Sequence, residues 1–184
     1  MNSLPLGSDW IPKWVAIVAL TVLAIWFGSL GREPLKGGPL PIVRLELAST
    51  VKAANEFMSA WQRARDSWQA DLDRAQGWDT WLICAYAPLF ALLCWTAATH
   101  FSSSFPRVAT LGFILAALQL AAGALDFLEN ACMQKTIDAG YATAPWPLIG
   151  ATASSAKWLL LTLFVLYGLT AVMHWVLGIV RHTV

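Results

Sequence analysis

Four long apolar stretches constrain the fold of this sequence more than any other feature. None of them contains Asp, Glu, Lys or Arg, and they cover residues 14–31, 81–99, 108–125 and 158–180. Each is close to the ~20 residues that a helix needs to cross ~30 Å of hydrocarbon. Backbone polar groups in lipid must be satisfied within the segment, and the patterns lack the alternation of barrel strands. We therefore predict an all-α integral membrane protein with four transmembrane helices.

Composition supports the same class. The 184 residues are 58% hydrophobic and only 12% charged, which is unlike an ordinary soluble domain. The net charge is +1, and no basic run alternates with aromatic residues, so we exclude nucleic-acid binding. We expect one membrane domain over residues 1–184, whose partners are the lipid bilayer and other membrane protein subunits.

Flanking residues place the helix boundaries. The spans are expected at about residues 12–31, 78–99, 107–131 and 155–181, with Gly77 ending the helix before the second span. The third span is rich in small residues, which let helices approach closely in lipid, so we place it at the centre of the bundle. These residues are Gly112, Ala116, Ala117, Ala121, Ala122, Gly123 and Ala124. Gln119 lies in mid-membrane and is expected to form a hydrogen bond with a neighbouring helix.

The connector over residues 32–77 carries two patterns. Residues 43–47 alternate with period two, which predicts a short extended piece. From Ser49, a predicted N-cap, to Ala75 the apolar residues follow a heptad track that only Arg65 interrupts. We predict one amphipathic helix that lies in the membrane interface or caps the bundle; a coiled-coil partner is the alternative. The track comprises Val51, Ala54, Met58, Trp61, Arg65, Trp68, Leu72 and Ala75.

One polar cluster interrupts the apolar pattern. Asp126, Glu129 and Asn130 have i, i+3, i+4 spacing and so share one helical face. Ionisable groups at membrane depth are costly, and they are normally paired, turned inward or functional. Antiparallel spans bring this triplet to one rim of the bundle beneath the amphipathic helix. The other residues that we expect at this rim are Asp79, Tyr86 and Lys157.

The cluster has two interpretations. The favoured one is a structural ion-pair knot with Lys157 and Arg74 as counter-charges, because most such clusters are structural. The other is a site for a hard cation, a proton or a lipid headgroup. Zinc is not expected, since it prefers His and Cys and no His lies on this side, and we assign no metal ligands. Haem ligation by His100 or His174 is disfavoured because we place these residues at different levels, so no cofactor is expected.

Part of the chain resembles a known pattern. Glu46-Leu-Ala precedes the amphipathic helix, Trp61 lies within it, Asp79 and Tyr86 follow in the second span, and the Asp126-x-x-Glu-Asn triplet ends the third. Over residues 43–130 this order is similar to that of small, uncharacterised bacterial four-transmembrane-helix proteins. The resemblance implies the same fold and implies that Glu46 belongs to one constellation with the other motif residues. It supplies no activity.

Three classes of function are compared for this sequence: an accessory subunit, a lipid- or ion-handling protein and a transporter. The preferred hypothesis is a non-catalytic accessory or assembly subunit that packs against a larger membrane complex, because the sequence has no nucleophile–base pair and no phosphate loop. The alternative is a lipid- or ion-handling protein, conceivably an enzyme that uses Tyr86 as an acid or base. A transporter is weaker, since no broken mid-membrane helix is apparent.

The expected location is the bacterial inner membrane. Three Lys and Arg residues lie on the N-terminal side and nine on the other, so a simple count places the amphipathic helix in the cytoplasm. The nine are spread over far more residues, and their density gives no preference. The side on which the N-terminus lies is left open.

Overall fold

The computed structural model describes residues 10–183, with side chains described for residues 13–174. This part of the chain is all-helical and contains no strand. Its helices are α1 (Trp10–Arg32), α2 (Val43–Glu46), α3 (Val51–Ala64), α4 (Trp68–Phe101), α5 (Pro106–Ala139) and α6 (Trp146–Thr183). The four long helices α1, α4, α5 and α6 are long and apolar enough to cross a membrane, as predicted.

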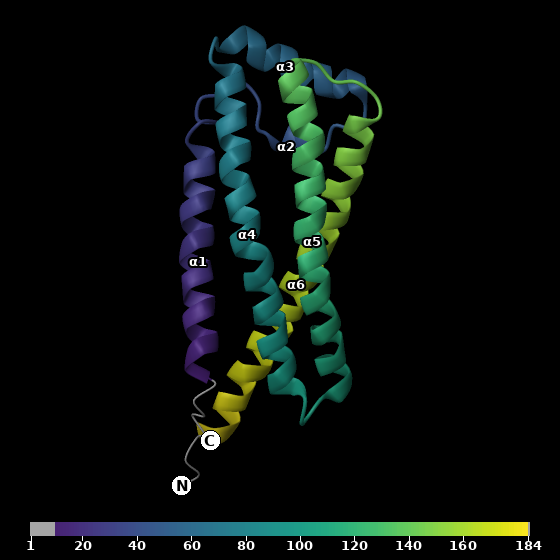
Figure 1. Cartoon of the computed structure of the whole chain (residues 1–184). Helices are drawn as coiled ribbons and strands as arrows, with labels where there is room; N and C mark the ends of the chain where they lie inside the picture. Colours follow the sequence, from purple (N-terminus) through teal and green to yellow (C-terminus); the bar gives the residue numbers. More distant parts are fainter. Residues whose placement is uncertain (1–9, 184) are drawn as a thin grey trace.

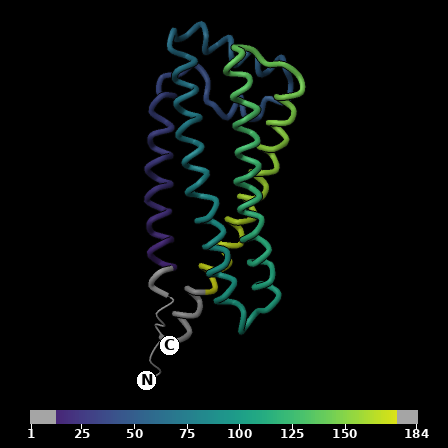
Figure 2. The backbone as a smooth tube through the Cα atoms, viewed as in Figure 1, coloured from purple at the N-terminus to yellow at the C-terminus, as the bar shows by residue number. Residues whose placement is uncertain are grey.

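The long helices form a bundle around α5. This helix packs between α4 and α6, whereas α1 packs on α4 and α6 crosses the bundle obliquely (Figure 1). The connector between α1 and α4 folds back over one end of the bundle (Figure 2). There α3 lies across the ends of the long helices, and α2 sits beneath it between them (Figure 1). The polar site lies below this cover.

The long helices extend beyond the predicted spans. The prediction that Gly77 ends a helix is wrong, because α4 runs from Trp68 to Phe101 without a break. Gly inside a helix costs only about 1 kcal/mol relative to Ala, which a long packed helix tolerates. Helix α5 continues to Ala139, where Gly140 takes a positive φ of 73° and ends it.

Residues 43–46 form one helical turn, so the predicted extended piece is wrong. Leu45 is buried, whereas Val43 and Leu47, which are four residues apart, are exposed. An apolar residue between two exposed ones fits a strand and a single helical turn equally well over so short a stretch. The turn places Glu46 close to the long helices.

The predicted amphipathic helix is two helices. Its N-cap is Thr50, whose hydroxyl oxygen accepts a hydrogen bond from the Ala53 amide at 3.2 Å, and not Ser49. The helix ends at Arg65, the residue that interrupts the heptad track, which has an extended backbone. The Arg65 guanidinium donates to the Pro34 carbonyl oxygen at 3.1 Å and lies 3.3 Å from the Asp71 carboxylate. These contacts to the connector and to α4 hold the corner between the two helices.

Helix α3 caps the bundle. Its apolar face is buried against Met133 and Ile137 of α5, in a cluster that includes Phe57 and Trp61. The Trp61 side chain is fully buried, and its indole N–H donates to the Leu40 carbonyl oxygen at 3.2 Å. Because this face is covered by its own chain, it offers no surface to the coiled-coil partner considered above.

Four of the seven small residues singled out on α5 face its neighbours. Gly112, Ala116, Ala122 and Gly123 are buried, whereas Ala117, Ala121 and Ala124 are exposed. Gln119 is fully buried and donates to the Leu160 carbonyl oxygen on α6 at 3.1 Å, which confirms the predicted interhelical hydrogen bond.

We expect Trp61→Phe to lower the free energy of unfolding by about 1 kcal/mol. Phe keeps an aromatic ring at this position. However, the Leu40 carbonyl group loses its hydrogen-bond donor, and α3 loses contact area with the bundle. The measurement is a denaturant titration of the purified protein in detergent. Trp95→Phe is the matched control, since Trp95 is 49% exposed, and it should change the value by less than about 0.5 kcal/mol. Equal effects of the two substitutions would contradict the capping role of α3.

Candidate functional site

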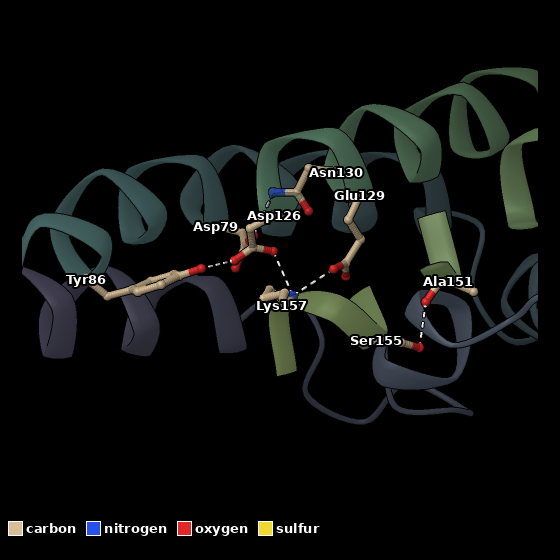
Figure 3. Close-up of polar contacts among 8 residues, drawn as sticks. All are labelled: Asp79, Tyr86, Asp126, Glu129, Asn130, Ala151, Ser155 and Lys157. Carbon is tan, nitrogen blue, oxygen red and sulfur yellow. Dashed lines mark hydrogen bonds and ion pairs between the residues drawn. The ribbon is translucent and has the colours of Figure 1, made fainter. Parts of the chain in front are cut away.

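The centre of the site is a buried ion-pair group formed by three helices. The Lys157 ammonium on α6 lies 2.7 Å from an oxygen of Asp126 and 2.7 Å from an oxygen of Glu129, both on α5 (Figure 3). The Tyr86 hydroxyl on α4 donates a hydrogen bond to the second oxygen of Asp126. All four side chains are at least half-buried, and Glu129 is only 1% exposed. We call these four residues the Lys157 group.

The spacing along each helix explains this group. Asp126 and Glu129 are three residues apart and so present both carboxylates to the same neighbour, α6. Tyr86 follows Asp79 by seven residues, two turns along the same face of α4. Asp126 lies 20 residues from the start of α5 at Pro106, or about 30 Å of helix, which places it near the edge of the hydrocarbon.

A second set of polar residues adjoins the Lys157 group. The Asn130 side-chain amide donates to an Asp79 carboxylate oxygen at 2.6 Å, which links α5 to α4 (Figure 3). Among the described residues, no cation lies within ion-pair distance of Asp79. Glu46, on α2, forms no hydrogen bond or ion pair through its side chain with a described residue.

The charged groups of the site act electrostatically on the Glu46 carboxyl group. Burial raises its pKa above the ordinary value, the Lys157 ammonium opposes this, and the charges of Asp79 and Asp126 raise it further. Glu46 is therefore near enough to these groups for their charges to act on it. The resemblance predicted that Glu46 belongs to this constellation, and the structure places it there.

The site contains more negative than positive charge. Four carboxylates (Glu46, Asp79, Asp126 and Glu129) and two cations, the Lys157 ammonium and the exposed Arg32 guanidinium at the end of α1, sum to −2 when all are ionised. The ammonium contacts only Asp126 and Glu129. Glu46 and Asp79 are thus the two carboxyl groups without a contacting cation, and like charges this close disfavour one another.

A cavity of about 190 Å³ lies against these two carboxyl groups. Its walls come from α1, α4 and α5 and from the connector that includes α2. The polar side chains that line it are Arg32, Glu46, Gln76, Asp79 and Asn130, and the apolar ones include Phe27, Leu35, Ile42, Leu82 and Met133.

The structure brings together all six residues predicted for the rim, and Glu46 with them. The prediction that Arg74 is a counter-charge is wrong, because its side chain is exposed and contacts none of the carboxylates. The heptad track continues past Arg65 to Ala75, so the prediction assigned residues 68–75 to the amphipathic helix. In the structure these residues are the first part of α4. Gln76 was missed, although its position three residues before Asp79 places both on one face of α4.

The two histidines at the opposite end are close together. The ring centroids of His100 and His174 are 5.8 Å apart, so the prediction that they lie at different levels is wrong. Helix α6 crosses the bundle obliquely (Figure 1), and the His174 ring lies 5.2 Å from that of Phe101, the last residue of α4. Among the described residues, no group of three or more His, Cys, Asp and Glu is arranged to hold a metal ion.

The fold and the site define an all-α membrane protein with a polar site buried between its helices, beneath a capping helix. Comparison of the chain with models of protein families, with curated proteins and with solved structures gives no match.

Proposed function

We propose that this protein is a lipid- or ion-handling membrane protein that holds the positive charge of a ligand at Glu46 and Asp79. One observation carries the proposal: these two carboxyl groups lack a contacting cation and line the same cavity. Both side chains are half-buried, and carboxylates at such a depth are normally paired or in use, since desolvation without a partner is costly. A cation that enters the cavity would reduce the excess negative charge.

The site divides into two parts with different roles. In the Lys157 group, the ammonium is satisfied by Asp126 and Glu129, and the group ties α5 to α6. We assign to this part the role of a structural ion-pair knot, with Lys157 as its cation. Asp79 and Glu46 lie on its cavity side and are the groups available to a ligand.

The test is the thermal stability of the purified protein in detergent with added cations at constant ionic strength. Sodium, magnesium and a primary amine form the panel. We expect at least one of them to raise the melting temperature of the wild type, because a ligand that binds only the folded state stabilises it. Asp79→Asn should abolish the rise, and Glu56→Gln, an exposed position on α3, should retain it. No rise in the wild type, or the same rise in Asp79→Asn, would reject the proposal.

Glu46→Gln gives a prediction about pH. Because the folded-state pKa of Glu46 is raised, the folded protein binds this proton more tightly than the unfolded chain. Wild-type stability should therefore fall as pH rises from about 4.3 towards the raised pKa, and Gln removes this loss. Without ligand, Glu46→Gln should be more stable relative to wild type at pH 8 than at pH 4. A difference that is the same at both pH values, measured by denaturant titration, would refute the burial of a carboxyl group here.

A second candidate function is the accessory or assembly subunit. The observation that favours it is the exposure of large apolar side chains along α1 and α6, among them Trp26 and Trp158. Aromatic residues are frequent at protein interfaces, but lipid covers such faces equally well. Purification in mild detergent followed by identification of co-purifying membrane proteins tests this candidate.

A further inference from the structure

The cavity beside Glu46 and Asp79 has one polar side and one apolar side. The two carboxyl groups and the Asn130 amide lie where α2 meets α4 and α5. Phe27 and Gly28 precede Arg32 by four to five residues in α1, and Leu82 follows Asp79 by three residues in α4, so the end of the cavity that lies deeper in the bundle is apolar. A molecule that fills the cavity would therefore meet negative charge at one end and hydrocarbon at the other.

Gln76 is an independent sign that the cavity holds a polar ligand. Its side chain is only 7% exposed and lines the cavity, yet its amide forms no hydrogen bond with a described residue. Its amide atoms stay accessible from the cavity, and polar groups at such a depth are normally hydrogen-bonded to protein, water or a ligand. The amide has donors and an acceptor, so it can bind an ammonium through its oxygen.

Size and charge select the ligand. An engineered cavity of about 150 Å³ binds benzene, so about 190 Å³ holds a compact headgroup with the start of an alkyl chain. Two carboxyl groups and amide oxygens match the three N–H donors of a primary ammonium. We propose that this cavity binds the primary ammonium of an amphiphile, with the ammonium between Glu46 and Asp79 and the alkyl part against α1. The inference rests on the proposed function and names its ligand class.

Two sources could supply this ammonium: an aminoethyl phospholipid of the membrane, or a free alkylamine. Arg32 distinguishes them. It lies at the end of α1, lines the cavity, and its exposed side chain forms no ion pair with a described residue. A guanidinium in this position matches the phosphate of a phospholipid and has no role for a simple amine.

The experiment measures binding to the full-length protein in nanodiscs of phosphatidylcholine. The probes are octylamine, octanol as its neutral counterpart, and phosphatidylethanolamine, with native mass spectrometry as the readout. We expect octylamine, phosphatidylethanolamine or both to bind, and octanol to bind at least ~10-fold more weakly, because it lacks the charge. Asp79→Asn should weaken binding of the ammonium probe by at least ~10-fold.

A second variant fills the cavity without altering its charge. A Cβ at Gly28 would meet Leu82 only at 3.9 Å, an ordinary contact, so Gly28→Leu can direct its side chain into the open space. It should abolish binding, and Gly168→Leu, where a Cβ would have no neighbour within 4 Å, should not. Circular dichroism confirms that both variants are folded. Gly28→Leu binding as the wild type does would place the ligand elsewhere and overturn the inference.

The remaining outcomes are equally decisive. Binding of phosphatidylethanolamine that Arg32→Gln weakens supports the inference with a membrane lipid as the source, whereas binding of octylamine alone supports it with a free amine. Equal binding of octylamine and octanol, or binding of neither amine probe, overturns it. If sodium or magnesium still stabilises the wild type but not Asp79→Asn, the proposed function stands although the inference has failed.

Discussion

Lys157→Met is expected to be the most destabilising conservative change in this protein. It leaves the Asp126 and Glu129 carboxylates, each 2.7 Å from the lost ammonium, buried without a cation. Removal of one partner from a buried ion pair typically costs about 3–5 kcal/mol, because the remaining charge is uncompensated. Denaturant titration in detergent should show a loss of this size. Lys52→Met, at an exposed position on α3, is the control and should change stability by less than about 0.5 kcal/mol.

A double variant tests the pairing itself. Asp126→Asn alone leaves the ammonium with Glu129 as its partner and deprives Tyr86 of a charged acceptor, so we expect an intermediate loss. Combining Asp126→Asn with Lys157→Met removes one of the two uncompensated carboxylates. The double variant should therefore be more stable than Lys157→Met alone. Additive losses would show that the Lys157 group is not an interacting unit.

Gly123→Ala is the second large effect that we expect. The added methyl group would lie 2.7 Å from the Cβ of Ala87 on α4, closer than real Cβ contacts, and both residues are buried. Overpacking of this kind costs about 1–3 kcal/mol, and here it would force α4 and α5 apart near the site. The measurement is again the unfolding free energy, with Gly168→Ala as a control at a position without neighbours.

Exchange of the two small residues should restore the packing. The double variant Ala87→Gly and Gly123→Ala moves one methyl group from α4 to α5 and keeps the total volume constant. We expect it to recover most of the stability that Gly123→Ala loses. A double variant that is less stable than Gly123→Ala would show that the steric contact is not the cause of the loss.

The sequence predicted the parts of this molecule that depend on local composition and spacing. Uncharged apolar runs identified four helices, and the i, i+3, i+4 spacing of Asp126, Glu129 and Asn130 placed them on one face. Lys157 was predicted as their counter-charge because it begins the fourth apolar run on the same side. Lipid imposes strong rules on which residues can occur in these segments, and those rules make the pattern readable.

The features that escaped prediction depend on tertiary packing. The local pattern of residues 43–47 does not favour a helical turn. The turn is stabilised by a tertiary contact, the burial of Leu45 beneath α3. Arg65 breaks the heptad track, but its role as a corner depends on the distant carbonyl group of Pro34. The cavity is likewise a property of several helices that pack imperfectly, and Gln76 acquires its importance only from lining it.

The cover formed by the first connector has a consequence for the order of assembly. Helix α2, from the first third of the chain, packs against α5 and against α6, which is synthesised last. The contacts of α2 with α6 can therefore form only once α6 has been synthesised. A nascent chain with two helices inserted has Asp79 in the membrane without Asn130, and one with three has Asp126 and Glu129 without their cation. The polar site is thus complete only when α6 is present, and a chain that stops before α6 carries Asp126 and Glu129 near the edge of the hydrocarbon without their cation.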